Sequence, residues 1–180
     1  MFHQNIRKGF KVRIKYWGAH HDKNEQPPSP DRWKTTIKLE ISTEEIIVHN
    51  PAQKSIYHPF SDSLISREPI LCYTLDEVLA EKLRALIQRS YTAPRDYFDI
   101  YNLTQDFNPA DWQNIKPLFL KKMAYKEIPY QGPEQLVEPV SIERVRKAWN
   151  TSLKHQINGN QNINADEIIT AVKNRIIENL

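Results

Sequence analysis

Apolar and polar residues alternate strictly in two segments near the start of the chain. Residues 10–16 place apolar side chains on one face and three cations, Lys11, Arg13 and Lys15, on the other. Residues 36–42 alternate in the same way. A period of two residues is typical of a half-buried strand. Because the connections between these segments are short, they predict an antiparallel sheet.

The rest of the first 73 residues has weaker patterns. Shorter extended pieces are expected at residues 45–48 and 55–57, where prolines flank short apolar runs. Residues 20–30 offer no apolar residue to bury, which predicts a loop. The His20-His21-Asp22 triplet at its start has metal-binding residue types, but nothing at helical or strand spacing completes a site. A loop without metal is the favoured interpretation.

From residue 74 onward the apolar residues recur with a helical period. Thr74 suits the N-cap position, and Glu77 stands where a capping box requires an acid. This helix should end at about Arg89, and further helices are expected at residues 95–103, 109–122, 142–156 and 165–179. The pattern predicts an α+β chain, with a small, mainly antiparallel β-rich part at residues 1–73 and a helical C-terminal lobe at residues 74–180.

Composition excludes several classes of protein. The 180 residues contain four glycines, none in a Gly-rich phosphate-binding loop, which argues against P-loop NTPases and dinucleotide oxidoreductases. The single cysteine, Cys72, allows neither an internal disulfide nor a cysteine-based zinc site. No apolar run approaches the roughly 18 residues of a membrane span, and no signal peptide is evident, so we expect a cytoplasmic protein without membrane contact. The net charge of +3 permits nucleic-acid binding without indicating it.

Two cations stand on the apolar side of the predicted helix that begins at residue 75. A helical wheel places Lys82 and Arg89 inside the arc formed by the apolar residues. A charge on a buried helix face lowers the stability of the fold unless it is paired with an opposite charge or serves to bind a ligand. That arc comprises Leu75, Val78, Leu79, Leu83 and Leu86, and the face predicted to be solvated comprises Glu77, Glu81, Arg84 and Gln88.

The next predicted helix shows the same anomaly with opposite charge. Asp96 and Asp99 lie on the same side as its apolar residues. One interpretation is a structural lattice of buried ion pairs, in which Asp96 could also cap free N–H groups of its helix. The other is that Lys82 contacts a phosphate while an aspartate orients it or assists proton transfer. The helical wheel does not decide between them.

Other candidate residues are isolated. Glu40 lies on the polar face of its strand beside Lys38, where it is either a solvent-facing acid or a Mg²⁺ ligand for nucleotidyl transfer. Trp33, Trp112 and Trp149 are interpreted as core or interface residues rather than base-stacking platforms.

The segment at residues 74–86, followed by Arg89 and by residues 94–103, resembles a signature of one family. The signature reads A-E-K-L-x-A-L-x-x-R and then R-D-x-x-D-[IL], and this chain has AEKLRALIQR and RDYFDI. It is similar to the AbiEii/AbiGii-type nucleotidyltransferase-like toxins of bacterial abortive-infection and toxin–antitoxin systems. The strand that carries Glu40 resembles the later acidic strand of that fold.

The resemblance implies a polymerase-β-like nucleotidyltransferase core that binds a nucleoside triphosphate with Mg²⁺. A GTP preference is associated with some members, and others add nucleotides to tRNA acceptor ends. By position, Lys82, Asp96 and Asp99 match catalytic residues of the motif, and Lys82 with Arg89 and Arg95 is expected to contact nucleotide, whereas Glu40 is the candidate metal ligand. A cognate antitoxin, encoded in an AbiEi-like operon, is the implied protein partner.

The chain departs from the family pattern in one respect. The Gly-Ser motif and the D-x-D pair that hold triphosphate and metal in relatives occur nowhere in it. We therefore expect a C-terminal portion of such a toxin, inactive by itself. The alternative is a non-catalytic module that binds RNA or a protein through the cationic strand with Lys11, Arg13 and Lys15.

Overall fold

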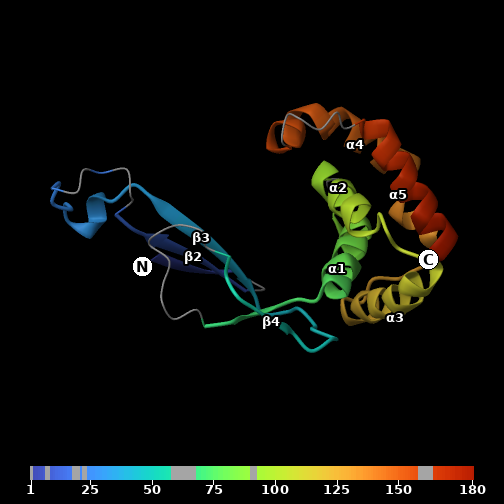
Figure 1. Cartoon of the computed structure of the whole chain (residues 1–180), viewed down its shortest axis with the longest axis horizontal. Coiled ribbons are helices and arrows are strands. Elements are labelled where there is room, and N and C mark those ends of the chain that lie inside the picture. Colours follow the sequence, from blue (N-terminus) through green and yellow to red (C-terminus); the bar gives the residue numbers. More distant parts are fainter. Residues whose placement is uncertain are drawn as a thin grey trace. The chain divides into compact units, whose positions relative to one another are not determined.

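The computed structural model describes residues 2–6, 9–17, 21, 24–57, 68–89, 93–157 and 164–180. The chain divides into two compact units, Met1–Ile46 and Ile47–Leu180 (Figure 1). Both sheets are antiparallel and the second unit is mostly helical, so the predicted α+β class is confirmed.

The first unit is built on a three-stranded antiparallel sheet of order β1-β2-β3. Its strands are β1 (Phe2–Ile6), β2 (Gly9–Lys15) and β3 (Thr36–Ser42), with a short 3-10 turn η1 (Pro30–Arg32) between the last two. The two alternating segments are thus confirmed as paired strands. In their register Val12 lies opposite Leu39 and Ile14 opposite Ile37, so the apolar side chains share one face.

Two features of this sheet differ from the alternation-based prediction. Strand β1 was not predicted, because its central His3, Gln4 and Asn5 give no apolar alternation. The apolar face is also more open than a half-buried strand implies, since Ile37 and Ile41 are 49% and 47% exposed. Within the described part of this unit, no helix other than η1 is present.

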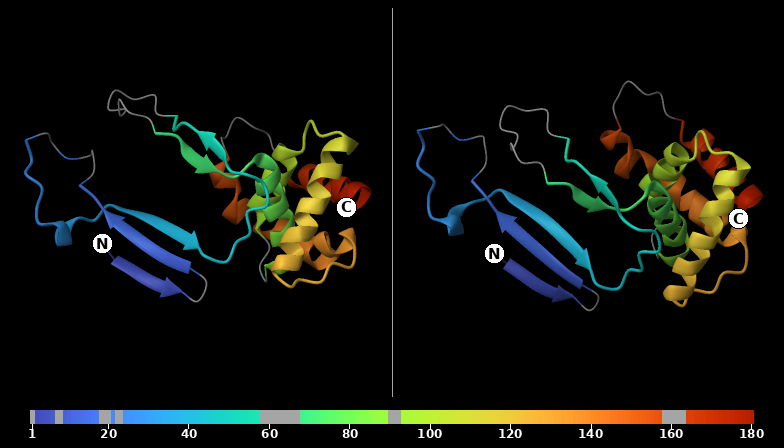
Figure 2. Two further views of the ribbon diagram at one scale, coloured as in Figure 1. Left: turned by 90° about the horizontal axis from the view of Figure 1, so that it is seen from below. Right: turned by 60° about the horizontal axis from the view of Figure 1, so that its bottom comes forward.

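The second unit begins with a two-stranded antiparallel hairpin. It pairs β4 (Ala52–Lys54) with β5 (Ile70–Cys72), and β5 leads directly into the first helix (Figure 2). The extended pieces predicted at residues 45–48 and 55–57 are wrong, because the structure has no strand at either place. The backbone N–H groups of Val48 and His49 instead donate to a side chain of the first helix.

Five α-helices complete the described part of the second unit: α1 (Leu75–Gln88), α2 (Pro94–Leu103), α3 (Pro109–Tyr125), α4 (Pro139–Ser152) and α5 (Ala165–Asn179). Two 3-10 turns, η2 (Pro133–Leu136) and η3 (Lys154–Gln156), flank α4. All five predicted helices are confirmed. Among the helix bounds, those of α4 differ most from the prediction. This helix begins earlier than predicted because Pro139 occupies its first turn, a position that proline favours.

The core of the second unit lies among its helices. Tyr97 of α2, Phe119 of α3 and Val172 of α5 are fully buried, and burial raises the pKa of Tyr97 to about 12. Trp112 and Trp149 are only 3% exposed, which confirms them as core residues. No helix in the described ranges is both long and apolar enough to cross a membrane.

Candidate charge clusters on helix α1

Helix α1 packs against both α2 and α3 and carries charged residues toward each of them. Its start is fixed by Thr74, whose hydroxyl accepts a hydrogen bond from the N–H of Glu77 at 3.2 Å. The predicted N-cap is therefore confirmed. The reciprocal half of the capping box does not form, because the Glu77 carboxylate instead pairs with Lys122 and accepts hydrogen bonds from the backbone of Val48 and His49.

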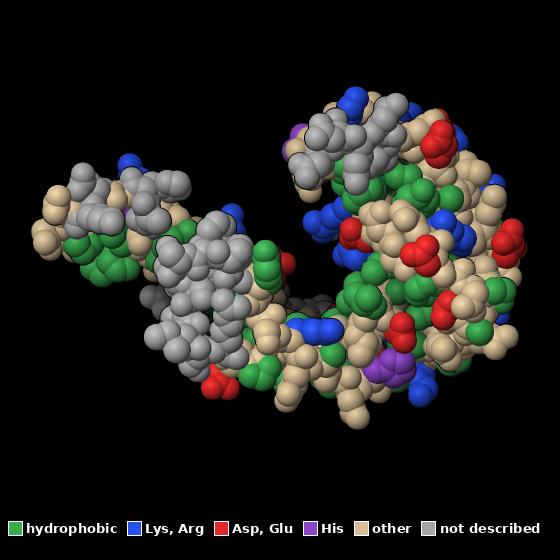
Figure 3. All heavy atoms as spheres, viewed as in Figure 1, with side chains coloured by type: hydrophobic (Ala, Val, Ile, Leu, Met, Phe, Trp, Pro, Cys, Tyr) green, Lys and Arg blue, Asp and Glu red, His purple; other side chains and the backbone are tan. Residues whose placement is uncertain are grey.

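The α1–α2 cluster consists of Lys82, Arg89, Asp96 and Asp99. The Lys82 ammonium donates to Asp96 Oδ1 at 3.0 Å and to Asp99 Oδ2 at 2.5 Å. Arg89 donates to the other carboxylate oxygen of Asp96. Two cations and two carboxylates thus form one network between the helices, and Figure 3 shows charges of both signs side by side in this part of the helical unit. The structure brings these four predicted site residues together.

Burial differs sharply among the four members. The Asp96 side chain is 2% exposed, whereas the side chains of Lys82, Arg89 and Asp99 are 23%, 32% and 40% exposed. Asp96 is therefore a buried anchor for both cations, and the other three lie where solvent reaches them. Since charge-assisted hydrogen bonds are short and directional, Asp96 holds Lys82 and Arg89 in defined positions.

Arg95 stands apart from this cluster. It is exposed in the first turn of α2, and no ion pair to it is seen within the described ranges. The structure therefore places Lys82 and Arg89, but not Arg95, against the aspartates.

The α1–α3 cluster consists of Glu77, Glu81, Arg84 and Lys122. Lys122 of α3 is 1% exposed, and its ammonium lies 2.5 Å from Glu77 Oε1 and 2.7 Å from Glu81 Oε1. Glu81 also accepts from Arg84 Nε at 3.0 Å. The Glu77 carboxylate additionally accepts from the backbone N–H groups of Val48 and His49, at 3.0 and 3.1 Å.

This second cluster corrects the predicted orientation of α1. Glu77 and Arg84, expected on the solvated face, are 0% and 7% exposed, whereas Leu75, expected in the apolar arc, is 68% exposed. The helical wheel failed because the face that meets α3 is charged and receives its neutralising cation from Lys122. A weak signal exists in the sequence, since Lys122 stands between apolar residues on the buried side of α3, next to Met123.

The surroundings of this cluster shift the pKa values of its members. Burial raises the pKa of Glu77, but hydrogen bonds from Lys122, Val48 and His49 outweigh burial and hold this pKa below its ordinary value. Burial likewise opposes ionisation of Glu81, yet Lys122 and Arg84 lower its pKa. For Lys122, burial lowers the pKa while the two carboxylates raise it, and the net shift is upward. All three groups are therefore stabilised in their charged forms.

We expect the second unit to lose stability in acid through this cluster. Carboxylates with lowered pKa values stabilise the fold above their ordinary value of 4.5, and this contribution disappears as the pH falls through their folded-state pKa. The raised pKa of Lys122 acts at the other end, where stability is lost as the pH rises through it. The midpoint of urea unfolding, measured across pH, should fall in acid for the wild type and fall less for Glu77→Gln. Glu178→Gln, at an exposed position of α5, is the control. Equal acid slopes in all three proteins would contradict this expectation.

Glu40, the predicted metal ligand, lies in the other unit on β3. It is directly opposite Lys11 of β2, and the two form an ion pair of 3.2 Å with side chains 73% and 52% exposed. Of the cationic strand, Lys15 is also engaged, through a hydrogen bond of 2.9 Å from its ammonium to the Asp31 carbonyl. Glu40 is thus a solvent-facing, paired acid in this structure.

Metal-binding residue types do not converge in the described part of the chain. Among those residues, no three or more His, Cys, Asp or Glu side chains lie together where they could hold an ion. Of the His20-His21-Asp22 triplet, His20 and Asp22 lie outside the described residues. His21 stacks on Trp17 and approaches Glu25 at 3.2 Å.

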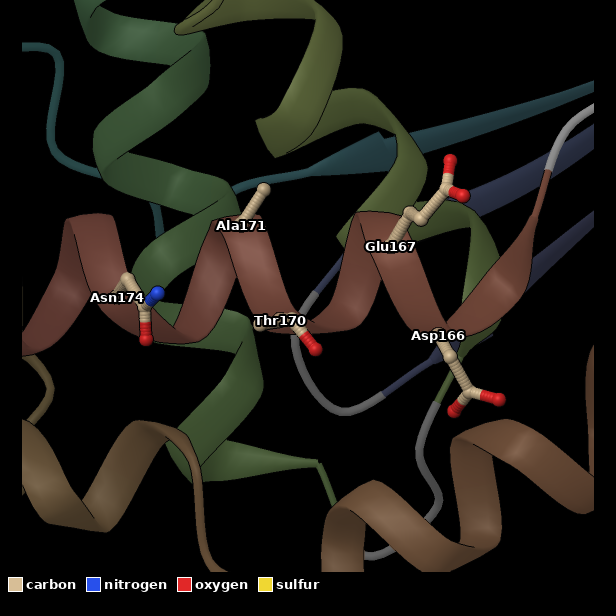
Figure 4. Close-up of a pocket in the computed structure, with 5 residues that line it drawn as sticks. All are labelled: Asp166, Glu167, Thr170, Ala171 and Asn174. Carbon is tan, nitrogen blue, oxygen red and sulfur yellow. The ribbon is translucent and has the colours of Figure 1, made fainter.

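A shallow hollow of about 440 Å³ lies along α5 and contains no predicted site residue. Figure 4 shows that all of its labelled lining residues project from this one helix. They are Asp166, Glu167, Thr170, Ala171 and Asn174. The hollow lacks the convergent polar groups from several elements that ligand sites have.

The charged motif on α1 and α2 resembles a signature of nucleotidyltransferase-like toxins, and comparison with known families matches the chain as a whole to such a family. The family described as nucleotidyl transferase AbiEii toxin of type IV toxin–antitoxin systems matches residues 2–171. The chain therefore belongs to this family. No curated protein and no solved structure matched the chain.

Proposed function

We propose that the α1–α2 cluster contacts the phosphates of a nucleoside triphosphate in a cytoplasmic toxin that transfers nucleotides to RNA, with tRNA as the acceptor and a cognate antitoxin as partner. The observation that carries the proposal is the pairing of two partly exposed cations, Lys82 and Arg89, on the buried carboxylate of Asp96. Membership of the AbiEii family supports the transferase class.

The cluster suits phosphate binding because its cations are held but not buried. An ammonium has three N–H donors, and Lys82 uses two of them on Asp96 and Asp99. A phosphate oxygen could take the third, or replace the more exposed Asp99. Cations preset by a buried anion need little reorganisation when charge develops nearby, which is how such groups stabilise a transition state. In this proposal Asp96 orients the cations. Asp99 is the carboxylate whose hydrogen bond from Lys82 a phosphate oxygen can replace.

The residues that the structure describes do not form a magnesium site. Mg²⁺ requires several oxygen ligands in near-octahedral geometry. Glu40 is paired with Lys11, Asp96 and Asp99 face cations, and within the described ranges no three or more His, Cys, Asp or Glu side chains gather where they could hold an ion. In the family the D-x-D pair holds the ion, and the sequence lacks this pair. We therefore derive no metal-dependent step from these residues.

We expect the chain alone to transfer no nucleotide. Purified chain incubated with labelled nucleoside triphosphates, Mg²⁺ and tRNA should give no labelled RNA, because the ligands that two-metal phosphoryl transfer needs are missing. Product formation that disappears in Glu40→Ala would contradict this expectation, since it would make Glu40 a functional metal ligand. Lys38→Ala, at a neighbouring exposed position of β3, is the matched control.

A further inference from the structure

A second surface with nucleotide-binding chemistry lies in the first unit, where the chain between β2 and β3 folds back on the strand ends. It is a hollow of about 260 Å³. Its lining includes three rings, those of Tyr16, Trp17 and His21, and two cations, Arg32 and Lys34. None of these residues belongs to the predicted site.

Backbone carbonyls hold the walls of this hollow in place. The Tyr16 N–H donates to the Thr35 carbonyl at 3.1 Å, which extends the pairing of β2 and β3 beyond their last residues. The Trp33 indole N–H donates to the Pro28 carbonyl at 2.8 Å. Together with the bond from Lys15 to Asp31, these contacts tie η1 and its flanks to the sheet, at the end of the β2–β3 pair (Figure 2).

Trp17 and His21 form a stacked pair, the Trp17–His21 platform, in which each ring covers one face of the other and only an outer face can receive a base. Trp17 and His21 stack with centroids 3.5 Å apart and planes 13° from parallel. Tyr16, next to them, is 40% exposed. Large rings at a solvent-accessible site are suited to stacking with a second flat group, because every nucleobase has a π face.

The cations beside the platform carry uncompensated charge. Arg32 and Lys34 are exposed, and among the residues that the structure describes neither has a carboxylate within ion-pair distance. The Asp31 carboxyl, which directly precedes Arg32 in the chain, is engaged in its own turn, where hydrogen bonds from Ser29 and from its own backbone lower its pKa. A ligand with a flat ring and an anionic group would therefore meet complementary chemistry on both sides of the hollow.

We propose that this hollow binds one unpaired nucleotide of a single-stranded nucleic acid, with the base on the Trp17–His21 platform and the flanking phosphates at Arg32 and Lys34. A double helix would not fit this chemistry, since its bases are stacked inside and only its backbone is offered. The hollow shares no residue with the α1–α2 cluster, so nucleotide binding here can be tested independently of the proposed transferase function.

The test is binding of fluorescein-labelled octanucleotides to the purified chain, followed by anisotropy. An unstructured RNA octamer and the DNA octamer of the same sequence distinguish ribose from deoxyribose, and an RNA duplex of the same length is the paired control. We expect single strands to bind more tightly than the duplex. Trp17→Ala should raise Kd for single strands about tenfold, which is the loss expected for one stacked base.

The contribution of Arg32 and Lys34 is measured separately, by the salt dependence of the binding constant. In the double variant Arg32→Ala/Lys34→Ala, the slope of log K against log salt should shrink by about 1.4, or about 0.7 per lost phosphate contact on a single strand. Tyr57→Ala, an 86% exposed aromatic of the second unit, and Lys121→Ala, an exposed cation of α3, should leave Kd unchanged.

Several results would overturn the proposal. These are no binding of either octamer by the wild type at low salt, equal binding of duplex and single strand, or an unchanged Kd for folded Trp17→Ala. If Trp17→Ala disturbs the fold by circular dichroism, Trp17→Phe decides. Phenylalanine keeps a stacking ring, so Kd should stay within about threefold of wild type, and a tenfold loss in this variant would also refute the base-stacking role.

Discussion

Replacement of Lys122 by alanine is expected to lower the free energy of unfolding of the helical unit by about 3–5 kcal/mol. The ammonium of Lys122 is 1% exposed and lies 2.5 Å from Glu77, which is itself fully buried. Its removal leaves a buried carboxylate without its cation, with only the backbone N–H groups of Val48 and His49 still donating to it. Urea unfolding followed by far-UV circular dichroism measures the loss, and the melting temperature should fall by about 10 °C.

Two further variants separate lost charge pairing from lost packing. Lys121→Ala removes an exposed lysine from the adjacent position of α3 and should change stability by less than about 0.5 kcal/mol. Lys122→Met combined with Glu77→Gln removes both charges but keeps side-chain volume, and should recover at least half of the loss. A loss below about 1 kcal/mol in Lys122→Ala would show that the α1–α3 cluster is not a buried ion-pair network.

Replacement of Lys82 by alanine is expected to have the opposite profile, with little effect on stability and a large effect on function. The Lys82 side chain is 23% exposed, and Arg89 still pairs with the buried Asp96 when Lys82 is absent. We therefore expect a loss of about 1 kcal/mol or less, as for a solvent-accessible pair. Toxicity of a protein that joins this chain to the Gly-Ser and D-x-D motifs of the family should nevertheless be abolished, because the variant lacks the proposed phosphate contact.

The comparison requires thermal unfolding of the purified chain beside a growth assay with that joined protein. Lys126→Ala, near the end of α3, serves as a control that should retain toxicity, since this lysine lies outside the α1–α2 cluster. A destabilisation of about 3 kcal/mol or more in Lys82→Ala would favour the purely structural interpretation of the α1–α2 cluster. Full toxicity of a stably folded Lys82→Ala protein would refute the phosphate contact.

Local patterns predicted the elements well where the pattern was long. The strand at residues 36–42 and the helix at residues 165–179 have the predicted bounds, because alternation and an Asn164 cap specify them locally. Strand β5, with three residues of which two are 47% and 69% exposed, has no such pattern. Its pairing with β4 depends on contacts between distant segments.

The same distinction applies to the candidate site. The helical wheel identified Lys82 and Asp96 as charges on packed faces, and the structure joins them. It assigned Glu77 to solvent because Glu77 lies opposite the apolar arc, among other polar residues of α1. Its partner Lys122 stands 45 residues further along the chain, as the two positions in the sequence show. A wheel drawn on one helix contains no information about which charge a neighbouring helix brings.

The two clusters also determine how α1 can sit among its neighbours. One side of the helix is paired with α2 through Lys82, and the other with α3 through Glu77 and Glu81. A shift of one residue turns a helix by about 100°, so any alternative register would break pairs on both sides at once and leave buried charges unmatched. Apolar contacts alone tolerate such slippage far better. The ion pairs on both sides therefore fix the rotation of α1 about its own axis. They select a single alignment of the helix and destabilise misaligned packings during folding.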